Sequence, residues 1–357
     1  MLNRTEFLGV ASAAPAILLN RSAGPVVMST ANGNRFKNGG TQTCVERAFS
    51  GIARGEDVLD ALIAGVNINE LDPLDEGVGF GGLPNADGVV QLDSCCMHGP
   101  KKWAGGVAAI EGVRTPSLVA KAVMEQTDNQ LLAGAGAQQF ARSLGFPIDA
   151  DLNSDHSRAL WLEWKRRIDP EHYLDPAKRP HVAARAAESM VREGLVNIEH
   201  YWGTIVCAGL NASGDLCGVN SSSGLAFKIP GRTGDAAIPG AGLYVDNEVG
   251  VVGSTGRGES NLYALSASFI IERMSAGRSP KDAGMDALRR VKALTTEKRL
   301  LNGKGNPRFS LSFFVLAKSG DVAGVSMYHG PATFVARDGD GPRTVPLEGL
   351  LDGQPFD

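Results

Sequence analysis

The stretch TIVCAGLNASGDLCGVNSS, residues 204–222, decides the expected fold. Residues 204–210 form an apolar run, residues 211–214 supply Asn, Ser and Gly, and residues 216–222 form a second run. Two such runs joined by a short polar turn are typical of a β-hairpin. We therefore expect antiparallel strands in this part of the chain.

The pattern on either side of the hairpin comes in blocks of strands and helices. Before the hairpin, apolar runs predict strands at 26–30, 89–97 and 105–110, and helical spacing predicts helices within 45–68, 115–126 and 131–144. After it, helices are expected at 259–274 and 280–295, and strands at 309–316, 321–327 and 333–335. Hairpins and helices in blocks favour an α+β fold with antiparallel sheets covered by helices over a doubly wound parallel sheet.

Length and composition are typical of a globular protein and give no sign of nucleic-acid or membrane binding. The 357 residues allow about two domains or one large one, and 43% hydrophobic with 21% charged residues is typical of a globular protein. The net charge of −4 offers no basic field. We therefore expect neither a nucleic acid nor a membrane as a partner.

Two segments differ in character from the rest of the chain. Residues 1–24 carry Arg4 before a short apolar run, which suits an export signal, although Thr5 stands where a twin-arginine signal has its second arginine. This predicts a periplasmic or secreted protein, with a cytoplasmic protein carrying an N-terminal extension as the alternative. Residues 149–203 are rich in charge and predict exposed helices and a linker.

Metal and cofactor motifs do not appear in the sequence. The five cysteines form no C-x-x-C pair, and no H-E-x-x-H or other spaced histidine cluster occurs. We expect no metal and no cofactor, and we interpret His98, His200 and His329 as ordinary hydrogen-bonding residues. The sequence alone does not decide whether two of the cysteines form a disulfide.

The glycine-rich region 203–258 is the expected location of the chemistry. It holds 13 of the 45 glycines, interleaved with polar residues. Within it, Arg232 and Asp235 could bind the carboxylate and the ammonium of a zwitterion, or could form an ordinary surface ion pair. Spacing alone favours the surface pair. The sequence at 255–258, Thr-Gly-Arg-Gly, lacks the Lys-Ser/Thr of a phosphate-binding loop.

Several motifs together resemble the N-terminal-nucleophile hydrolases of the glycosylasparaginase (aspartylglucosaminidase) and isoaspartyl peptidase/asparaginase family. The resemblance extends from about residue 26 to residue 334. It rests on GFGGLPN at 79–85, DG at 87–88, LD at 92–93, AGGVA at 104–108, PSLVA at 116–120, GTI at 203–205, KIPGRTGD at 228–235, PGAG at 239–242 and STG at 254–256. It implies a four-layer αββα sandwich.

The resemblance also implies a mechanism and its residues. The chain would cut itself between Gly203 and Thr204, and Thr204 would then attack the side-chain amide of an asparagine derivative. Ser222 stands where the family has a threonine beside the nucleophile. Thr255 and the N–H of Gly256 would form the oxyanion hole.

Further implications concern the substrate and the organisation of the chain. Arg232 would bind the substrate's α-carboxylate, and Asp235 its α-ammonium. Residues 25–203 would form one fragment and residues 204–357 the other, assembled as a dimer of processed heterodimers. The expected substrate is N4-(β-N-acetylglucosaminyl)-L-asparagine, which would yield aspartate and the glycosylamine. The alternatives are an isoaspartyl peptidase/L-asparaginase and a relative that binds without processing itself.

Overall fold

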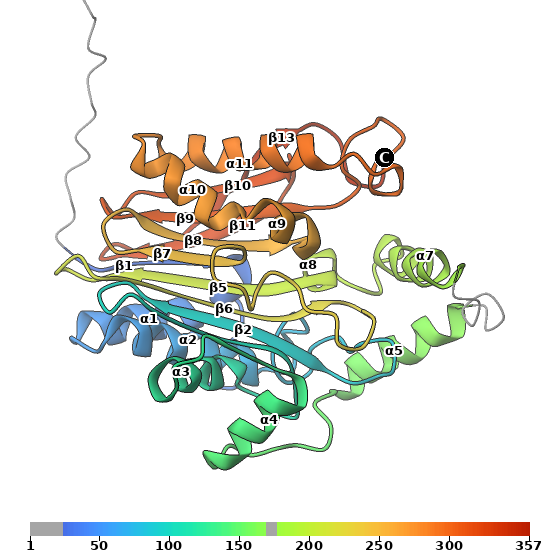
Figure 1. The fold of residues 1–357 in the computed structure, drawn as a ribbon, viewed down its shortest axis with the longest axis horizontal. Helices are drawn as coiled ribbons and strands as arrows, with labels where there is room; N and C mark the ends of the chain where they lie inside the picture. Colours follow the sequence, from blue (N-terminus) through green and yellow to red (C-terminus); the bar gives the residue numbers. More distant parts are fainter. Residues whose placement is uncertain (1–23, 169–176) are drawn as a thin grey trace, which may run out of the picture.

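The computed structural model describes residues 24–168 and 177–357, so nearly all of the expected export signal at 1–24 lies outside the described residues. Two β-sheets form the centre of the molecule (Figure 1). The eight-stranded sheet contains, in spatial order, β12 (Gly341–Pro346), β11 (Thr333–Asp338), β1 (Val26–Thr30), β5 (Trp202–Leu210), β6 (Leu216–Leu225), β2 (Gln91–His98), β3 (Trp103–Glu111) and β4 (Leu131–Ala133). The five-stranded sheet contains β13 (Glu348–Leu351), β10 (Val322–Tyr328), β9 (Leu311–Ala317), β8 (Gly250–Gly256) and β7 (Leu243–Asp246).

The hairpin expected at residues 204–222 is present as β5 and β6, and it lies in the middle of the larger sheet. Its turn is held by Asn211, whose Oδ1 accepts from the backbone N–H of Asp215 at 2.8 Å, and by Gly214 with φ +88°. The neighbouring pairs in both sheets are antiparallel except β3 with β4 and β10 with β13. The expected mixed α and β content, with antiparallel strands, is therefore observed.

Helices cover the outer face of each sheet (Figure 1). The larger sheet is covered by α1 (Cys44–Ala53), α2 (Val58–Leu71), α3 (Pro116–Gln126) and α4 (Gly134–Ser143), and the smaller one by α10 (Ser266–Ser275) and α11 (Pro280–Leu294). The inner faces pack on each other through a buried cluster to which the larger sheet contributes Met28 and Val206, and the smaller one Val251 and Phe314. The hairpin strand β5 is thereby fixed between two apolar layers.

The remaining helices of the described residues lie in the segments between these sheets and covering helices. They are η1 (Ala31–Asn34), α5 (Asp155–Arg167), α7 (Arg179–Arg192), α8 (Ile198–Tyr201), α9 (Gly258–Ala264) and η2 (Lys298–Leu300). The region expected to be exposed linker contributes to the core, since Trp164 is fully buried and stacks on Phe227 with 5.0 Å between ring centroids. The segment runs through α8 directly into β5, and it places Trp202 and Gly203 in the sheet.

Several expected boundaries differ in the structure for local reasons. The helical pattern at 45–68 is two helices, because Gly55 adopts φ +84° and Asp57 caps α2. The expected helix at 259–274 is interrupted by Leu265, which adopts φ +48° between α9 and α10. Residues 131–133 pair with β3 as a strand instead of starting a helix. No helix in the described part of the chain is both long enough and apolar enough to cross a membrane.

Candidate active site

Thr204 lies on β5 where the pairing with β6 shifts register between Gly203 and Ile205. Its hydroxyl donates to Oγ of Ser222 at 3.2 Å, and the Ser222 hydroxyl in turn donates to the carbonyl oxygen of Gly203 at 2.5 Å. The backbone N–H of Gly224 donates to the same serine oxygen at 2.8 Å. Ser222 therefore links the Thr204 hydroxyl to the carbonyl oxygen of the peptide bond that precedes it.

The loop at 75–77 lies against the other side of this peptide bond. A β-carbon added at Gly203 would stand 2.1 Å from Cα of Gly77, so no larger residue fits at position 203 without a movement of the backbone. The carbonyl oxygen of Gly77 accepts from the backbone N–H of Ser223 at 2.8 Å and from its hydroxyl at 3.0 Å. The loop is thus anchored to β6, the strand that also carries Ser222.

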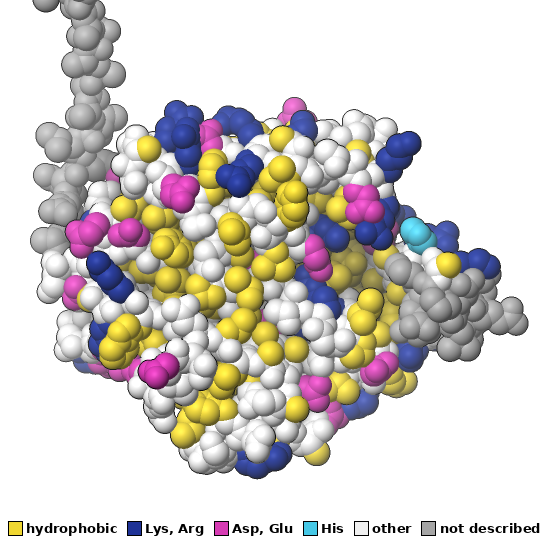
Figure 2. All heavy atoms as spheres, in the orientation of Figure 1, with side chains coloured by type: hydrophobic (Ala, Val, Ile, Leu, Met, Phe, Trp, Pro, Cys, Tyr) yellow, Lys and Arg dark blue, Asp and Glu magenta, His cyan; other side chains and the backbone are white. Residues whose placement is uncertain are grey.

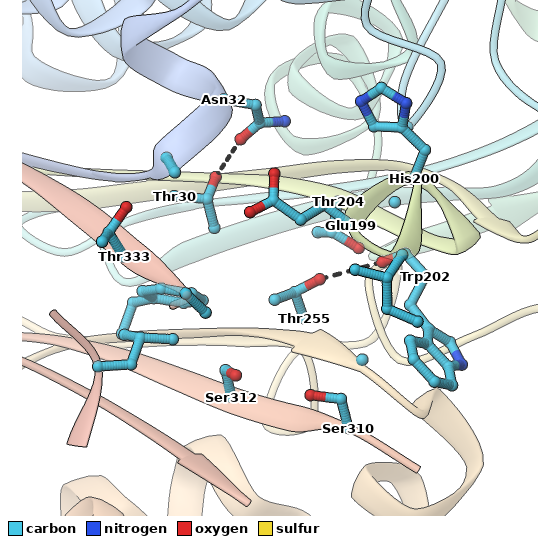
Figure 3. Close-up of a pocket in the computed structure, with 18 of the residues that line it drawn as sticks. Thr30, Asn32, Glu199, His200, Trp202, Thr204, Thr255, Ser310, Ser312 and Thr333 are labelled. Carbon is cyan, nitrogen blue, oxygen red and sulfur yellow. Dashed lines mark hydrogen bonds between the residues drawn. The ribbon is translucent and has the colours of Figure 1, made fainter. Parts of the chain in front are cut away.

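Thr255 lies close to the same segment but binds one residue further back. Its hydroxyl donates to the carbonyl oxygen of Trp202 at 3.0 Å, an interaction drawn in the close-up (Figure 3). Gly256, the next residue, has φ +121°, and a β-carbon there would stand 2.4 Å from the carbonyl oxygen of Ser310. In the uncut chain, Thr255 therefore holds the segment that precedes Thr204.

These residues border a cavity of about 140 Å³ between the two sheets, which we call the threonine cavity (Figure 3). Gly203, Thr204, Thr255 and Gly256 line it, and so does Trp202. Its remaining wall includes Thr30, Asn32, Asp75, His200, Ser312 and Thr333. Ser222 is buried behind Thr204 and does not line this cavity.

Arg232 and Asp235 converge on Gly258. A β-carbon added at Gly258 would stand 2.8 Å from Oδ1 of Asp235 and 3.1 Å from Nη2 of Arg232. The Nε of Arg232 donates to Glu259 at 2.8 Å. Burial by itself would raise the pKa of Glu259, but this hydrogen bond holds it at about 2. The two predicted binding residues are therefore neighbours, but Arg232 has a carboxylate partner that the sequence analysis did not identify.

Asp235 is buried and held by two side chains. Ser254 Oγ and Asn261 Nδ2 each donate to its Oδ2 at 2.6 Å. Burial raises the pKa of Asp235, and the two hydrogen bonds oppose that effect. The aspartate is thus fixed in one orientation.

The loop that carries both residues is fixed by buried charges. Lys228 Nζ donates to the carbonyl oxygens of Gln91 at 2.8 Å and Ser223 at 2.9 Å, and burial lowers its pKa to about 8. The carboxylate of Asp93 accepts from the backbone N–H of Gly234 at 3.3 Å. These contacts tie the loop to β2 and β6.

A second, larger cavity of about 580 Å³ lies beside this loop, and we call it the arginine cavity. Arg232 lines it, together with Lys228, Arg257 and Glu259. Trp202 borders both cavities. In the uncut chain, the predicted nucleophile and the predicted substrate-binding arginine therefore face different cavities, with the segment that ends in Trp202 and Gly203 between them.

Two acidic residues and a histidine in the threonine-cavity region were not predicted as site residues. His200 Nδ1 lies 3.3 Å from Glu76 Oε2, and its Nε2 lies 4.0 Å from Asp75 Oδ1. Burial alone lowers the pKa of His200, but the hydrogen bond to Glu76 raises it overall. Nothing in the local sequence pairs residues 75–76 with residue 200, because they meet only through the fold.

Among residues 24–168 and 177–357, no group of three or more His, Cys, Asp or Glu side chains is arranged to hold a metal ion. The five cysteines are buried free thiols. Hydroxyl groups, carboxylates and the imidazole of His200 line the threonine cavity, and guanidinium groups, carboxylates, the Lys228 amine and the imidazole of His181 line the arginine cavity.

Comparison with known proteins identifies the family of the chain. The family model described as asparaginase matches residues 13–299, well over half of the chain. The chain belongs to the asparaginase family. The resemblance seen in the sequence motifs is thereby confirmed.

Three relatives illustrate the range of this asparaginase family. An N(4)-(β-N-acetylglucosaminyl)-L-asparaginase from Elizabethkingia miricola is 34% identical, over 96% of this chain and 94% of its own length. A rat protein of the same name is 32% identical over 72% of this chain and 74% of its own. A probable isoaspartyl peptidase/L-asparaginase from Arabidopsis thaliana is 30% identical over 80% of this chain and 82% of its own length.

Proposed function

We propose that this chain is an amidohydrolase that activates itself by cutting the bond between Gly203 and Thr204. The observation that carries the proposal is the hydrogen-bond chain from the Thr204 hydroxyl through Ser222 to the Gly203 carbonyl oxygen. It joins the hydroxyl that would attack to the carbonyl that would be attacked. Family membership and the names of the relatives support the same function.

The self-cleavage begins when Thr204 Oγ1 attacks the carbonyl carbon of Gly203. Negative charge then develops on the Gly203 oxygen, where the Ser222 hydroxyl already donates at 2.5 Å. Collapse breaks the bond between the Gly203 carbonyl carbon and the Thr204 nitrogen, which takes up the proton that the hydroxyl has lost. The acyl group is then an ester on Thr204 Oγ1, and water hydrolyses it. The products are a Gly203 carboxylate and a free α-amino group on Thr204.

The amide hydrolysis uses the threonine that the first reaction has freed. An α-amino group has a pKa of about 8, so near neutral pH part of it is unprotonated and can accept the proton of the adjacent hydroxyl. Once Trp202 and Gly203 no longer separate the cavities, Thr204 can reach a substrate held by Arg232 and Asp235. Thr255 is then free to donate, with the N–H of Gly256, to the oxyanion of the tetrahedral intermediate.

The substrate we propose is N4-(β-N-acetylglucosaminyl)-L-asparagine, as in the names of the Elizabethkingia and rat relatives. The Arabidopsis relative supports isoaspartyl peptidase/L-asparaginase activity as the second candidate. Both reactions use the same aspartyl half of the substrate and the same residues. They differ in the group that leaves.

Three further parts of the proposal concern the whole molecule. We assign the two sheets and their outer helices to the four-layer αββα sandwich of the N-terminal-nucleophile hydrolases. We propose that the mature enzyme is a dimer of processed heterodimers. We also propose that residues 1–24 direct export to the periplasm or medium.

Denaturing electrophoresis and N-terminal sequencing of the purified protein test the proposal. We expect two fragments, the smaller of which begins with Thr204, and hydrolysis of the glycosylated asparagine. The variant Thr204→Ala should stay uncut and lose activity by a factor on the order of 10³ or more, because it lacks the nucleophile. A wild-type protein that stays uncut and hydrolyses neither glycosylated asparagine, nor free asparagine, nor β-aspartyl dipeptides would instead be a binding relative.

A further inference from the structure

The arginine cavity carries more positive charge than an aspartyl group needs. Lys228, Arg232, Arg257, Arg299 and Arg308 line it, against the carboxylates of Glu188 and Glu259. In the space-filling view, Lys and Arg side chains gather around the hollow beside α7 (Figure 2). Such a cavity favours a ligand with more than one negative charge.

Most of these arginines already have a carboxylate partner. Arg232 pairs with Glu259 at 2.8 Å, Arg308 with Glu188 at 2.8 Å, and Arg299 with Glu297 at 2.5 Å. Arg257 differs. Within the described part of the chain it forms no ion pair, and its Nε is buried without a hydrogen-bond partner.

Arg257 lines the arginine cavity and is adjacent along the chain to the predicted oxyanion residues. It follows the predicted oxyanion residues Thr255 and Gly256, and its backbone N–H donates to the carbonyl oxygen of Ser310 at 2.9 Å. Its guanidinium lies 5.7 Å from the ring centroid of Phe309, which restricts the side chain from one side. The next residue, Gly258, lies against Arg232 and Asp235. An unpaired guanidinium therefore faces the cavity next to the site of the aspartyl group.

The two candidate substrate types differ in what they offer this guanidinium. Their aspartyl half is a zwitterion, whose two charges are used by Arg232 and Asp235. A glycosylamine leaving group is neutral, whereas a leaving amino acid carries its own carboxylate. A carboxylate is the group that a guanidinium binds best, with two parallel hydrogen bonds.

We propose that Arg257 binds a carboxylate on the leaving group of the substrate, so that the enzyme prefers β-aspartyl compounds whose leaving amine carries a free carboxylate over their neutral counterparts. This rests on the proposed function, because it concerns the leaving group of the same reaction, and it favours the β-aspartyl peptides of the second candidate over glycosylated asparagine, whose leaving group is neutral. Arg257 sets the charge preference of the site, and Thr204 performs the chemistry on every substrate.

A matched pair of substrates tests the preference directly. β-Aspartyl-alanine and β-aspartyl-alaninamide differ only in the terminal carboxylate, and kcat/KM is measured for each with the self-cleaved enzyme. We expect the wild type to prefer the free carboxylate by about tenfold or more, the size of one charge-assisted contact. In Arg257→Gln the ratio should fall to within about twofold of one.

Arg299→Gln is the matched control, because Arg299 lines the same cavity but is 63% exposed and paired with Glu297. It should keep the wild-type ratio. Each ratio of kcat/KM values is measured within one preparation, so the effect of a partly misfolded fraction on activity cancels from it. Arg257→Lys keeps the positive charge without the two-point contact, and it should keep an intermediate preference.

The outcomes separate this inference from the proposed function. A wild type that hydrolyses both dipeptides equally, or an Arg257→Gln variant that keeps the preference, overturns the role of Arg257. So does a wild type that hydrolyses glycosylated asparagine but neither dipeptide. In all three cases the proposed function stands. A wild type that neither cuts itself nor hydrolyses any of these compounds overturns both.

Discussion

Gly203 and Gly77 lie against each other backbone to backbone, so closely that a β-carbon on Gly203 would stand 2.1 Å from Cα of Gly77. The peptide bond that precedes Thr204 therefore has the loop at 75–77 against its Gly203 backbone, and the Ser222 hydroxyl donates to its carbonyl oxygen. This contact explains why glycine stands before the threonine in this chain. A larger residue at 203 would require the loop or β5 to move.

The first prediction follows from this contact. In Gly203→Ala, the added methyl group displaces the peptide bond from Ser222, so self-cleavage should slow by at least about tenfold, with a loss of stability of about 1–3 kcal/mol from overpacking. The fraction of cut chain over time on denaturing gels, together with thermal unfolding, checks this. Gly136→Ala, where an added carbon meets no atom within 4 Å, is the control. Cleavage of Gly203→Ala at the wild-type rate would show that the contact does not position the bond.

The second prediction concerns the donor on the other side of the same bond. Ser222→Ala removes the hydroxyl that donates to the Gly203 carbonyl oxygen, and we expect self-cleavage to slow by a factor on the order of 10² to 10³. Ser222→Thr retains a hydroxyl and should restore most of the rate. The measurement is the first-order rate of fragment appearance. If Ser222→Ala cleaves as fast as Ser222→Thr, the hydrogen bond contributes nothing to the reaction.

The resemblance places Ser222 beside the nucleophile, and the register of the observed hairpin gives the same position. In a hairpin whose turn is at 211–214, Leu210 pairs with Leu216, and counting back along both strands brings Thr204 opposite Ser222. The structure adds only a register shift at Gly203. The strands and helices with clear periodicity, such as α11 and β9, were predicted for the same reason: local pattern determines them.

Other features depend on contacts between distant segments or on residues without a pattern. Strands β7 and β8 were not expected: β7 has only four residues, too few for a clear pattern, and glycines interrupt the apolar run of β8. The break at Leu265 depends on an αL residue that is not glycine, which sequence rules do not anticipate. The contact of Gly77 with Gly203 and the pairing of Arg232 with Glu259 arise only when the chain is folded.

The third prediction uses the buried amine of Lys228. Burial lowers the pKa of Lys228 to about 8, whereas an unfolded lysine has a pKa of about 10.4. Between these values the unfolded chain holds a proton that the folded protein has released, so the free energy of unfolding should rise with pH in that window. The full rise is on the order of 3 kcal/mol.

Urea unfolding from pH 7 to pH 10 checks this in the uncut Thr204→Ala background, where a single chain unfolds. Lys228→Met in that background lacks the titrating group and serves as the comparison. The difference in stability between the two proteins should increase in favour of the lysine as the pH rises above 8. A difference that is constant with pH would mean that the folded lysine keeps its proton throughout.

The fourth prediction separates the two cavities. Arg232 lies on the arginine cavity, and the contacts around the Gly203–Thr204 bond come from Ser222, Thr255 and Gly77. Arg232→Lys should therefore cut itself at the wild-type rate. Because Glu259 occupies Nε of Arg232, the substrate carboxylate must use the remaining nitrogens, and a lysine offers no such pair. We expect KM to rise by about tenfold or more, with a smaller effect on kcat.

Two measurements on the same preparation decide the fourth prediction. Gel densitometry gives the rate of fragment formation, and initial rates over a range of substrate concentration give KM and kcat. A variant that cleaves itself slowly would place Arg232 in the processing reaction and not in substrate binding alone. A variant with unchanged KM would remove Arg232 from the carboxylate site, because a lost two-point contact must appear as weaker binding of the aspartyl half that every candidate substrate shares.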